Sequence, residues 1–367
     1  MILTPARSPV KKPAKKVAAH TPPRIAQDFT QAIGSVPIVK LNQVSPQCQQ
    51  HNLYLKLESC NPGGSIKEKN AVCLVNLAEA NGLLQPGGTI VESSSGNFGI
   101  ALAMIGAVRG YQIKIVIDAK TSSTMRRILS AHGAELVEVP LSAADSNGSM
   151  QVARMEKAKA LAASIPGAWY PCQHLNPRNP DAHEIYTARE IETAFNGAPD
   201  AIVIGVSTAG QIAGISRYFK QRYPDTKIIG VDVAGSAVFG TPRSPYKMTG
   251  LGLSFIPPNF DPNLLDVAYT VSDRLAFSFC HQIAQCEGLL LGASTGAILA
   301  GGLAYAQANS SRHLSILMLN PDRGDRYLET VYDQDWLEAN QIELFSRQQL
   351  EVEVRALAPI KFTKNKS

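Results

Sequence analysis

Three kinds of motif are missing from this sequence, and each absence removes a class of protein. The 367 residues include six cysteines but no Cys-x-x-Cys pair and no histidine at zinc spacing, so we expect neither a metal centre nor a disulfide framework. No Gly-x-Gly-x-x-Gly follows an expected strand, which disfavours a nicotinamide dehydrogenase. The charge-free run 289–307 is interrupted by glycine, serine and threonine, so we predict no membrane span. From the cysteine pattern we expect reduced thiols in a cytoplasmic protein.

Acidic residues are absent from the first 27 positions, where six lysines and arginines lie among several prolines. This stretch has too little apolar surface to fold, and we predict a disordered basic tail over residues 1–29. A transit peptide is the alternative, disfavoured because serine is scarce and arginines are few. The formal charge of +5 falls to about −1 without the tail, so the body has no basic excess for nucleic-acid binding. A second tail is expected at residues 346–367.

Apolar, β-branched segments alternate with helical patterns along most of the chain. The expected strands are 36–41, 53–58, 89–92, 113–117, 135–139, 201–206, 227–231, 289–291 and 315–319, and the expected helices start at 67 or span 100–108, 124–132, 183–195 and 212–222. Such alternation builds βαβ units, so we predict an α/β fold of two doubly wound domains with a cleft between them. The larger domain would comprise residues 30–58 and 169–345, and the smaller, mobile one residues 59–168. Ligands of such sheets bind at the carboxyl ends of the strands.

A glycine-rich turn at residues 60–66 places Lys67 at the start of an apolar helical pattern. A nucleotide-binding phosphate loop would require Gly-Lys-Ser/Thr, whereas Lys67 lies between Ile66 and Glu68. The backbone N–H groups and the dipole at a helix N-terminus disfavour a further positive charge. Lys67 is therefore pushed toward its neutral, nucleophilic form, which suits a covalent link to a carbonyl compound.

Two motifs follow each other along the chain. They are Asn-Pro-Gly-Gly-Ser-Ile-Lys-Glu at 61–68 and Glu-Ser-Ser-Ser-Gly-Asn-Phe-Gly at 92–99. Together they resemble the pyridoxal-phosphate β-replacement enzymes, the family of cysteine synthase and cystathionine β-synthase. The resemblance extends from about residue 34 to residue 337. It implies pyridoxal-phosphate fold type II, similar to the tryptophan synthase β-subunit, with pyridoxal 5′-phosphate as the cofactor and Lys67 as the catalytic residue that carries it.

The resemblance also assigns roles to other strand-to-helix turns. Residues 207–211 would hold the cofactor phosphate, Asn97 its phenolic oxygen and Ser294 its pyridine nitrogen, where a neutral hydroxyl favours elimination over transamination. The expected cofactor-binding residues are Lys67, Asn97, Ser207, Thr208, Ala209, Gly210, Gln211 and Ser294. The expected substrate-binding residues are Ser94, Ser95, Gly96, Arg154, His174 and Gly250, the last in a Gly-Leu-Gly loop that would close over the site.

Simpler readings of the same residues stay open. Many strand-to-helix turns bind no phosphate. The alternative role of the serines at 93–95 and of Ser294 is that of ordinary helix N-caps. Arg154 lies in an expected amphipathic helix, where an arginine is more often solvated, and His174 can be structural. In the turn after the last strand, Asp325 and Arg326 are expected to form a surface ion cluster.

Departures from the cysteine synthase pattern bear on the substrate. Phe98 replaces a threonine, Ala209 and Gln211 alter the phosphate turn, and Arg323 stands where a serine is usual. The first hypothesis is a transferase that joins O-phospho-L-serine to L-glutamate through an aminoacrylate intermediate. Glutamate's extra carboxylate would explain departures such as Phe98 and Arg154.

Two alternatives remain. One is a sulfhydrylase that makes cysteine from O-acetylserine or O-phosphoserine, because residues 176–180 look more like that group. The other is a non-catalytic cofactor-binding partner or regulator. The resemblance further implies a homodimer acting on small amino-acid substrates and, for the first hypothesis, a place in 2,3-diaminopropionate and siderophore biosynthesis.

Overall fold

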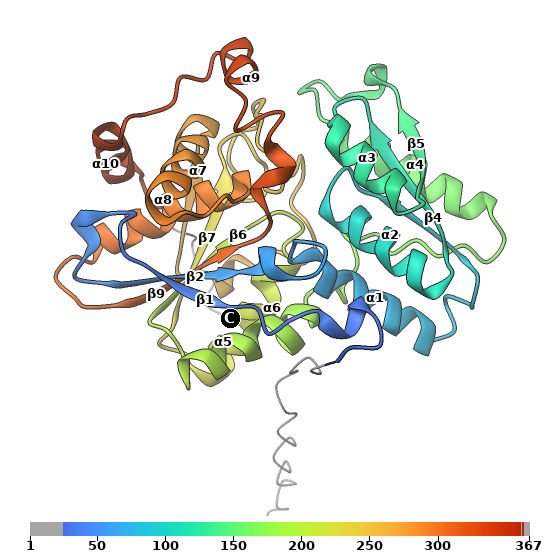
Figure 1. Ribbon diagram of the computed structural model, residues 1–367, viewed down its shortest axis with the longest axis horizontal. Helices are drawn as coiled ribbons and strands as arrows, with labels where there is room; N and C mark the ends of the chain where they lie inside the picture. Colours follow the sequence, from blue (N-terminus) through green and yellow to red (C-terminus); the bar gives the residue numbers. More distant parts are fainter. Residues whose placement is uncertain (1–24, 361, 363–367) are drawn as a thin grey trace, which may run out of the picture.

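The computed structural model describes residues 25–360 and 362, which form two sheets flanked by helices (Figure 1). The six-stranded sheet has the order β1-β2-β9-β6-β7-β8, and the three-stranded sheet has the order β3-β4-β5. The strands are β1 (Ile38–Leu41), β2 (Asn52–Leu57), β3 (Thr89–Ser93), β4 (Gln112–Asp118), β5 (Glu135–Val139), β6 (Ala201–Gly205), β7 (Lys227–Val233), β8 (Val267–Val271) and β9 (Ser315–Asn320). Neighbouring strands are parallel except β1 and β2, so the predicted α/β architecture is confirmed.

Helices cover both faces of each sheet. They are α1 (Lys67–Ala80), α2 (Asn97–Arg109), α3 (Ser123–Ala131), α4 (Gln151–Ser164), α5 (Ala188–Phe195), α6 (Gly210–Arg222), α7 (Asp273–Glu287), α8 (Ala293–Ala308), α9 (Gln334–Ala339) and α10 (Arg347–Ala356). Figure 1 shows α7 and α8 on one side of the six-stranded sheet and α5 and α6 on the other. A buried strand needs apolar residues on both faces, and β6 supplies them: Val203 packs toward α8, whereas Ile202 and Ile204 pack toward α6.

The three-stranded sheet is built in the same way. Alternate residues of β3 and β4 enter two separate cores, with Ile90 and Ile115 facing α1 and α2, and Val91 and Val116 facing α4. This period of two is the reason why the short apolar runs of the sequence form strands that are buried on both sides.

Several parts of the chain differ from the sequence-based expectation. The strand predicted at 289–291 is wrong, because only Leu291 pairs, in an isolated bridge with Arg323, and Leu290 is exposed. Only three residues separate Gly288, which ends α7, from Gly292, which precedes α8, and this leaves no length for a strand. The sequence patterns also missed β8, α7 and α9.

The two predicted tails have different outcomes. Residues 1–24 lie outside the described part of the chain, and Phe29 already begins a short 3-10 helix capped by the side chain of Asp28. The C-terminal segment contains α10, whose buried Leu350 and Val354 pack against α7 and α8. Within the described residues, no helix has the length and apolar character needed to cross a membrane.

Candidate active site

A cavity of about 650 Å³ lies where strands of both sheets end. Its walls come from the segments that follow β3, β4, β6 and β7, as expected for ligand sites in parallel sheets. The predicted residues that line it are Lys67, Ser94, Ser95, Gly96, Asn97, Arg154, His174, Ser207, Thr208 and Gly250. Ser294 lies behind this wall, 3.7 Å from the point that a Cβ on Gly250 would occupy. Ala209, Gly210 and Gln211 continue from Thr208 into α6.

Lys67 is the first residue of α1, and the turn before it is held from two sides. The N–H of Ile66 donates to the carbonyl of Pro321 at 2.8 Å, which ties the turn to the segment after β9. From within the turn, the N–H groups of Gly63 and Ser65 donate to the Glu68 carboxylate at 2.8 and 2.9 Å. The position of the lysine is therefore set before any ligand binds.

Burial is the main influence on the Lys67 amine. It lowers the pKa of Lys67 to about 8, and the nearby negative charge of Asp322 opposes the shift only in part. In the described part of the chain no hydrogen bond holds this amine. The direction expected from the sequence is thus confirmed, although the larger cause is desolvation rather than the helix dipole.

Asp322 is the centre of a buried network beside Lys67. The Asn97 Nδ2 donates to Asp322 Oδ2 at 2.7 Å, and the Tyr327 hydroxyl donates to the same oxygen at 2.6 Å. Arg326 donates to Asn97 Oδ1 and to the carbonyl of Gly63. Burial raises the pKa of Asp322, against the lowering effect of Arg326.

This network corrects one expectation. Arg326 is 8% exposed and lies inside the molecule, so the predicted surface ion cluster is wrong for this residue, whereas Asp325 is exposed. The reason is the 3-10 turn Gly324–Tyr327, which directs Arg326 back toward the N-terminus of α2. In the sequence, Arg326 lies three residues after Arg323, in the turn that was compared with the cysteine synthases. That position was the signal that could have identified Arg326 as a residue of the site.

The turn at residues 207–211 has the features of an anion site. Ala209 adopts a left-handed conformation (φ 62°) just before α6. Gly210 has no room for a side chain, because a Cβ there would lie 2.4 Å from Asn179 Oδ1. The first N–H groups of α6 have no acceptor within the helix, and such a helix start binds phosphate well. Gln211 Nε2 is buried without a hydrogen-bond partner in the described structure. An amine of lowered pKa and an anion-binding turn in one cavity fit a carbonyl compound that carries a phosphate.

Ser94 and Ser95 have different roles in the turn before α2. Ser94 Oγ accepts a hydrogen bond from the N–H of Gly99 at 2.9 Å, so it stabilises the start of the helix as a capping serine does. Ser95 Oγ instead accepts from Arg154 at 2.6 Å. Only Ser95 is therefore coupled to a charged side chain of the cavity.

Arg154 is buried, contrary to the common solvated state of a helical arginine. It is 7% exposed and forms an ion pair with Asp118 at 2.7 Å. Burial lowers the pKa of Arg154, and Asp118 counteracts this effect. Its Nε has no partner among the described residues, so one donor of the guanidinium is available for an anion.

His174 contributes a neutral ring to the same wall. Burial, together with the positive charges of Arg154 and Lys67, lowers the pKa of His174 to about 3. Its Nδ1 has no partner in the described part of the chain. At neutral pH the ring therefore carries no charge and can make one further hydrogen bond.

Other polar groups of the site were not predicted. Lys120, Arg243 and Lys247 also line the cavity. Lys120 follows the carboxyl end of β4, which was a usable signal, whereas the other two lie in the long loop after β7. Near Lys67 the sequence also hides a buried cluster of four charges, formed by Lys56, Glu58, Lys69 and Glu190.

Comparisons with known proteins agree with this geometry. The family model described as pyridoxal-phosphate dependent enzyme matches residues 29–322. The N-(2-amino-2-carboxyethyl)-L-glutamate synthases of Ralstonia nicotianae and Cupriavidus metallidurans are 36% and 35% identical over 313 and 315 residues, covering 85% of this chain and 91% and 92% of theirs. The crystal structure of O-ureido-L-serine synthase superposes with a TM-score of 0.78 at 32% identity, covering 89% of this chain and 99% of that one.

Proposed function

Because the chain belongs to the pyridoxal-phosphate dependent enzyme family, we propose that it joins O-phospho-L-serine to L-glutamate in a β-replacement reaction. The products would be N-(2-amino-2-carboxyethyl)-L-glutamate and phosphate. The two bacterial synthases of that name, which are similar over most of their length, support this reaction.

The observation that carries the choice of substrates is the charge of the cavity wall. One carboxylate, Asp118, stands among the lining residues with five cationic side chains besides Lys67, namely Lys120, Arg154, Arg243, Lys247 and Arg326. A cavity lined mostly by one sign of charge concentrates ligands of the opposite sign. Phosphoserine and glutamate carry more negative charge than acetylserine and hydrosulfide, so the wall favours the first pair.

Lys67 would perform the proton transfer. Pyridoxal 5′-phosphate supplies an aldehyde that links to amines and a ring that accepts electrons from the substrate α-carbon. Lys67 Nζ would be the covalent anchor of that aldehyde. As a free amine the same group would accept the proton of the substrate α-carbon, for which a pKa of about 8 is well placed.

Residues on three helix starts would hold the cofactor. The N–H groups at 207–211 and the unpaired Gln211 Nε2 bind its phosphate. Asn97 would serve its phenolic oxygen, and Ser294 its ring nitrogen. Asn97 is already held by Asp322 and Arg326, so its orientation does not depend on the ligand.

The substrates would meet the opposite wall. Residues 94–96 bind the α-carboxylate of the first substrate, and the free Nε of Arg154 and the ring of His174 bind a carboxylate of glutamate. The loop that contains Gly250 (φ 91°) closes the cavity against water.

A competition between nucleophiles tests the proposal. The holoenzyme is incubated with O-phosphoserine and either glutamate or sulfide, and the products are identified by mass. We expect faster turnover with glutamate and a product that contains both amino-acid skeletons. Faster formation of cysteine would identify a sulfhydrylase, and no spectral change on adding O-phosphoserine would favour a non-catalytic protein.

We also propose a cytoplasmic homodimer whose product enters 2,3-diaminopropionate and siderophore biosynthesis, as the family resemblance implies. The division into residues 59–168 and the remainder is supported by the sheets, since β3, β4 and β5 all fall in that segment. Analytical ultracentrifugation tests the dimer, and a purely monomeric protein would exclude it.

A further inference from the structure

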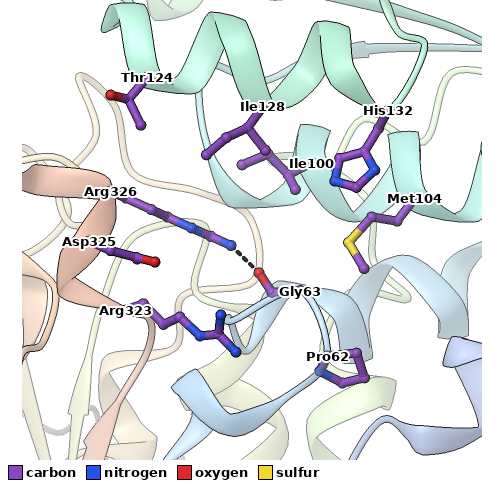
Figure 2. A pocket seen from close by; sticks show the side chains of 10 residues that line it. All are labelled: Pro62, Gly63, Ile100, Met104, Thr124, Ile128, His132, Arg323, Asp325 and Arg326. Atoms are coloured by element: carbon purple, nitrogen blue, oxygen red, sulfur yellow. Dashed lines mark hydrogen bonds between the residues drawn. The ribbon is translucent and has the colours of Figure 1, made fainter.

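A second cavity, of about 310 Å³, lies beside the active site (Figure 2). It is enclosed by α2 and α3 on one side and by the turns at 62–63 and 323–326 on the other. Its volume is at the lower limit of sites that bind small ligands. None of the reactions described above uses it.

The two walls of this cavity differ in chemistry. Ile100, Met104 and Ile128 project from α2 and α3 and form an apolar wall, as Figure 2 shows. The facing wall carries the guanidinium groups of Arg323 and Arg326. A site with one apolar and one cationic wall suits a molecule that has an apolar body and a carboxylate at one end.

The charges of the lining residues favour an anion. Asp325 is the one carboxylate among the lining residues, so two guanidinium groups leave an excess of one positive charge. Glu68 and Asp322 also act on Arg326 without lining the cavity, but burial raises the pKa of both carboxyl groups and so disfavours their charged forms. Burial and the charge of Arg326 lower the pKa of His132, which disfavours a positive charge on its ring. Arg323 and Asp325 are exposed, so a ligand can enter from solvent.

Arg326 connects this cavity with the active site. It lines both cavities, and its guanidinium donates to Asn97 and to the carbonyl of Gly63. Gly63 belongs to the turn that positions Lys67, and Asn97 begins α2. A carboxylate in the second cavity would compete for these donors, because it offers the guanidinium an opposite charge, whereas the Asn97 and Gly63 oxygens are neutral.

We propose that the second cavity binds a small carboxylate with an apolar body and that this binding slows the reaction at Lys67. The carboxylate meets Arg323 and Arg326, while the apolar part lies on Ile100, Met104 and Ile128. Binding loosens the hold of Arg326 on Asn97 and Gly63, so occupancy of the second cavity changes the active site without blocking it.

Calorimetric titration of the holoenzyme with 4-methylpentanoate tests the binding. The neutral isostere 4-methyl-1-pentanol serves as the ligand control. We expect saturable binding of the acid and at least about tenfold weaker binding of the alcohol. In turnover assays we expect saturating acid to lower kcat by about fivefold or more. Excess O-phosphoserine would not restore the rate.

Two variants separate this site from the active site. Ile128→Trp fills the cavity. Arg323→Ser removes one cation and introduces the residue that cysteine synthases usually have at this position. Both variants should lose binding of the acid and Ile128→Trp should retain the basal rate, whereas Arg312→Ser, in the loop before β9, should change neither binding nor rate. Unchanged binding in the first two variants, equal binding of the alcohol, or inhibition relieved by substrate would each overturn the proposal. The calorimetric result does not depend on which nucleophile the enzyme uses.

Discussion

Lys67 and Lys69 are two lysines of the same helix in opposite electrostatic states. Lys69 donates to Glu58 and Glu190 at 2.9 Å each, and these carboxylates raise its pKa despite burial. Burial instead lowers the pKa of Lys67 to about 8. Residues two apart on an α-helix project about 200° apart, so the two amines enter different surroundings. Burial alone therefore does not decide the state of a lysine, because the number of carboxylates in contact matters more.

The charged groups around Lys69 neutralise one another. Lys56 and Lys69 face Glu58 and Glu190, so two positive charges balance two negative ones without solvent. The pKa of Glu58 is lowered to about 2 by the two lysines, although its burial acts in the opposite direction. Among the described residues, Asp322 is the one carboxylate that acts on the pKa of Lys67, and that carboxylate is shared with Asn97 and Tyr327. The first region stabilises structure, whereas the second leaves an amine available for chemistry.

Replacing the available amine should have the largest effect. We expect Lys67→Ala to lower kcat by at least about 10³-fold, because both the cofactor anchor and the acceptor of the α-proton are lost. The free energy of unfolding of the cofactor-free protein should not fall, since no hydrogen bond in the described structure holds the amine and the burial of its charge opposes folding. Steady-state kinetics and urea unfolding measure the two quantities. Normal turnover by this variant would remove the basis of the proposed function.

Replacing the paired amine should act on stability instead. Lys69→Met leaves Glu58 and Glu190 with one cation, and breaking a buried pair costs about 3–5 kcal/mol of unfolding free energy. Urea unfolding of the variant measures this loss. The double variant Lys69→Met/Glu190→Gln should recover part of it, because the charges balance again. If Lys69→Met alone were as stable as the wild type, the charge balance of the cluster would not contribute to the free energy of unfolding.

Arg154 should affect substrate binding more than chemistry. We expect Arg154→Gln to raise the KM for glutamate by about 10- to 100-fold, the equivalent of one charge-assisted hydrogen bond. Arg109→Gln is the matched control, since Arg109 pairs with Glu79 and does not line the cavity. Equal KM values for the two variants would contradict the role assigned to Arg154.

The pH dependence of stability should show the smallest effect. Lys67 has a folded-state pKa of about 8, below its ordinary 10.5, so the unfolded chain binds more protons between these values. The free energy of unfolding of the cofactor-free protein should therefore rise through this window, by less than about 1.4 kcal/mol per pH unit. Below pH 8 the cost of burying the charge is fully present. The contribution is obtained by subtracting the same profile for Lys67→Met, and identical profiles would show that burial does not shift this lysine.

The features that were predicted correctly from the sequence depend on residues close together in the chain, and those that were missed depend on contacts between distant elements. Strands such as β5 and β6 were expected because each carries its own apolar pattern within a few residues. The predicted strand at 289–291 failed because three leucines do not reveal that a helix end and a helix start enclose them. Arg154 had the spacing of a solvated helical residue, and only Asp118 and Ser95, which come from other elements, explain its burial.

The sequence by itself determined the alternation of strands and helices and the presence of a lysine at a helix start after a glycine turn, because these depend on neighbours along the chain. The tertiary structure decided which lysine is free and which is paired. Lys56 and Glu190 are 134 residues apart and meet at 2.5 Å only because the tertiary fold brings a residue of β2 to a residue of α5. Arg326 likewise joins Asn97 across 229 residues, a contact that no local pattern contains.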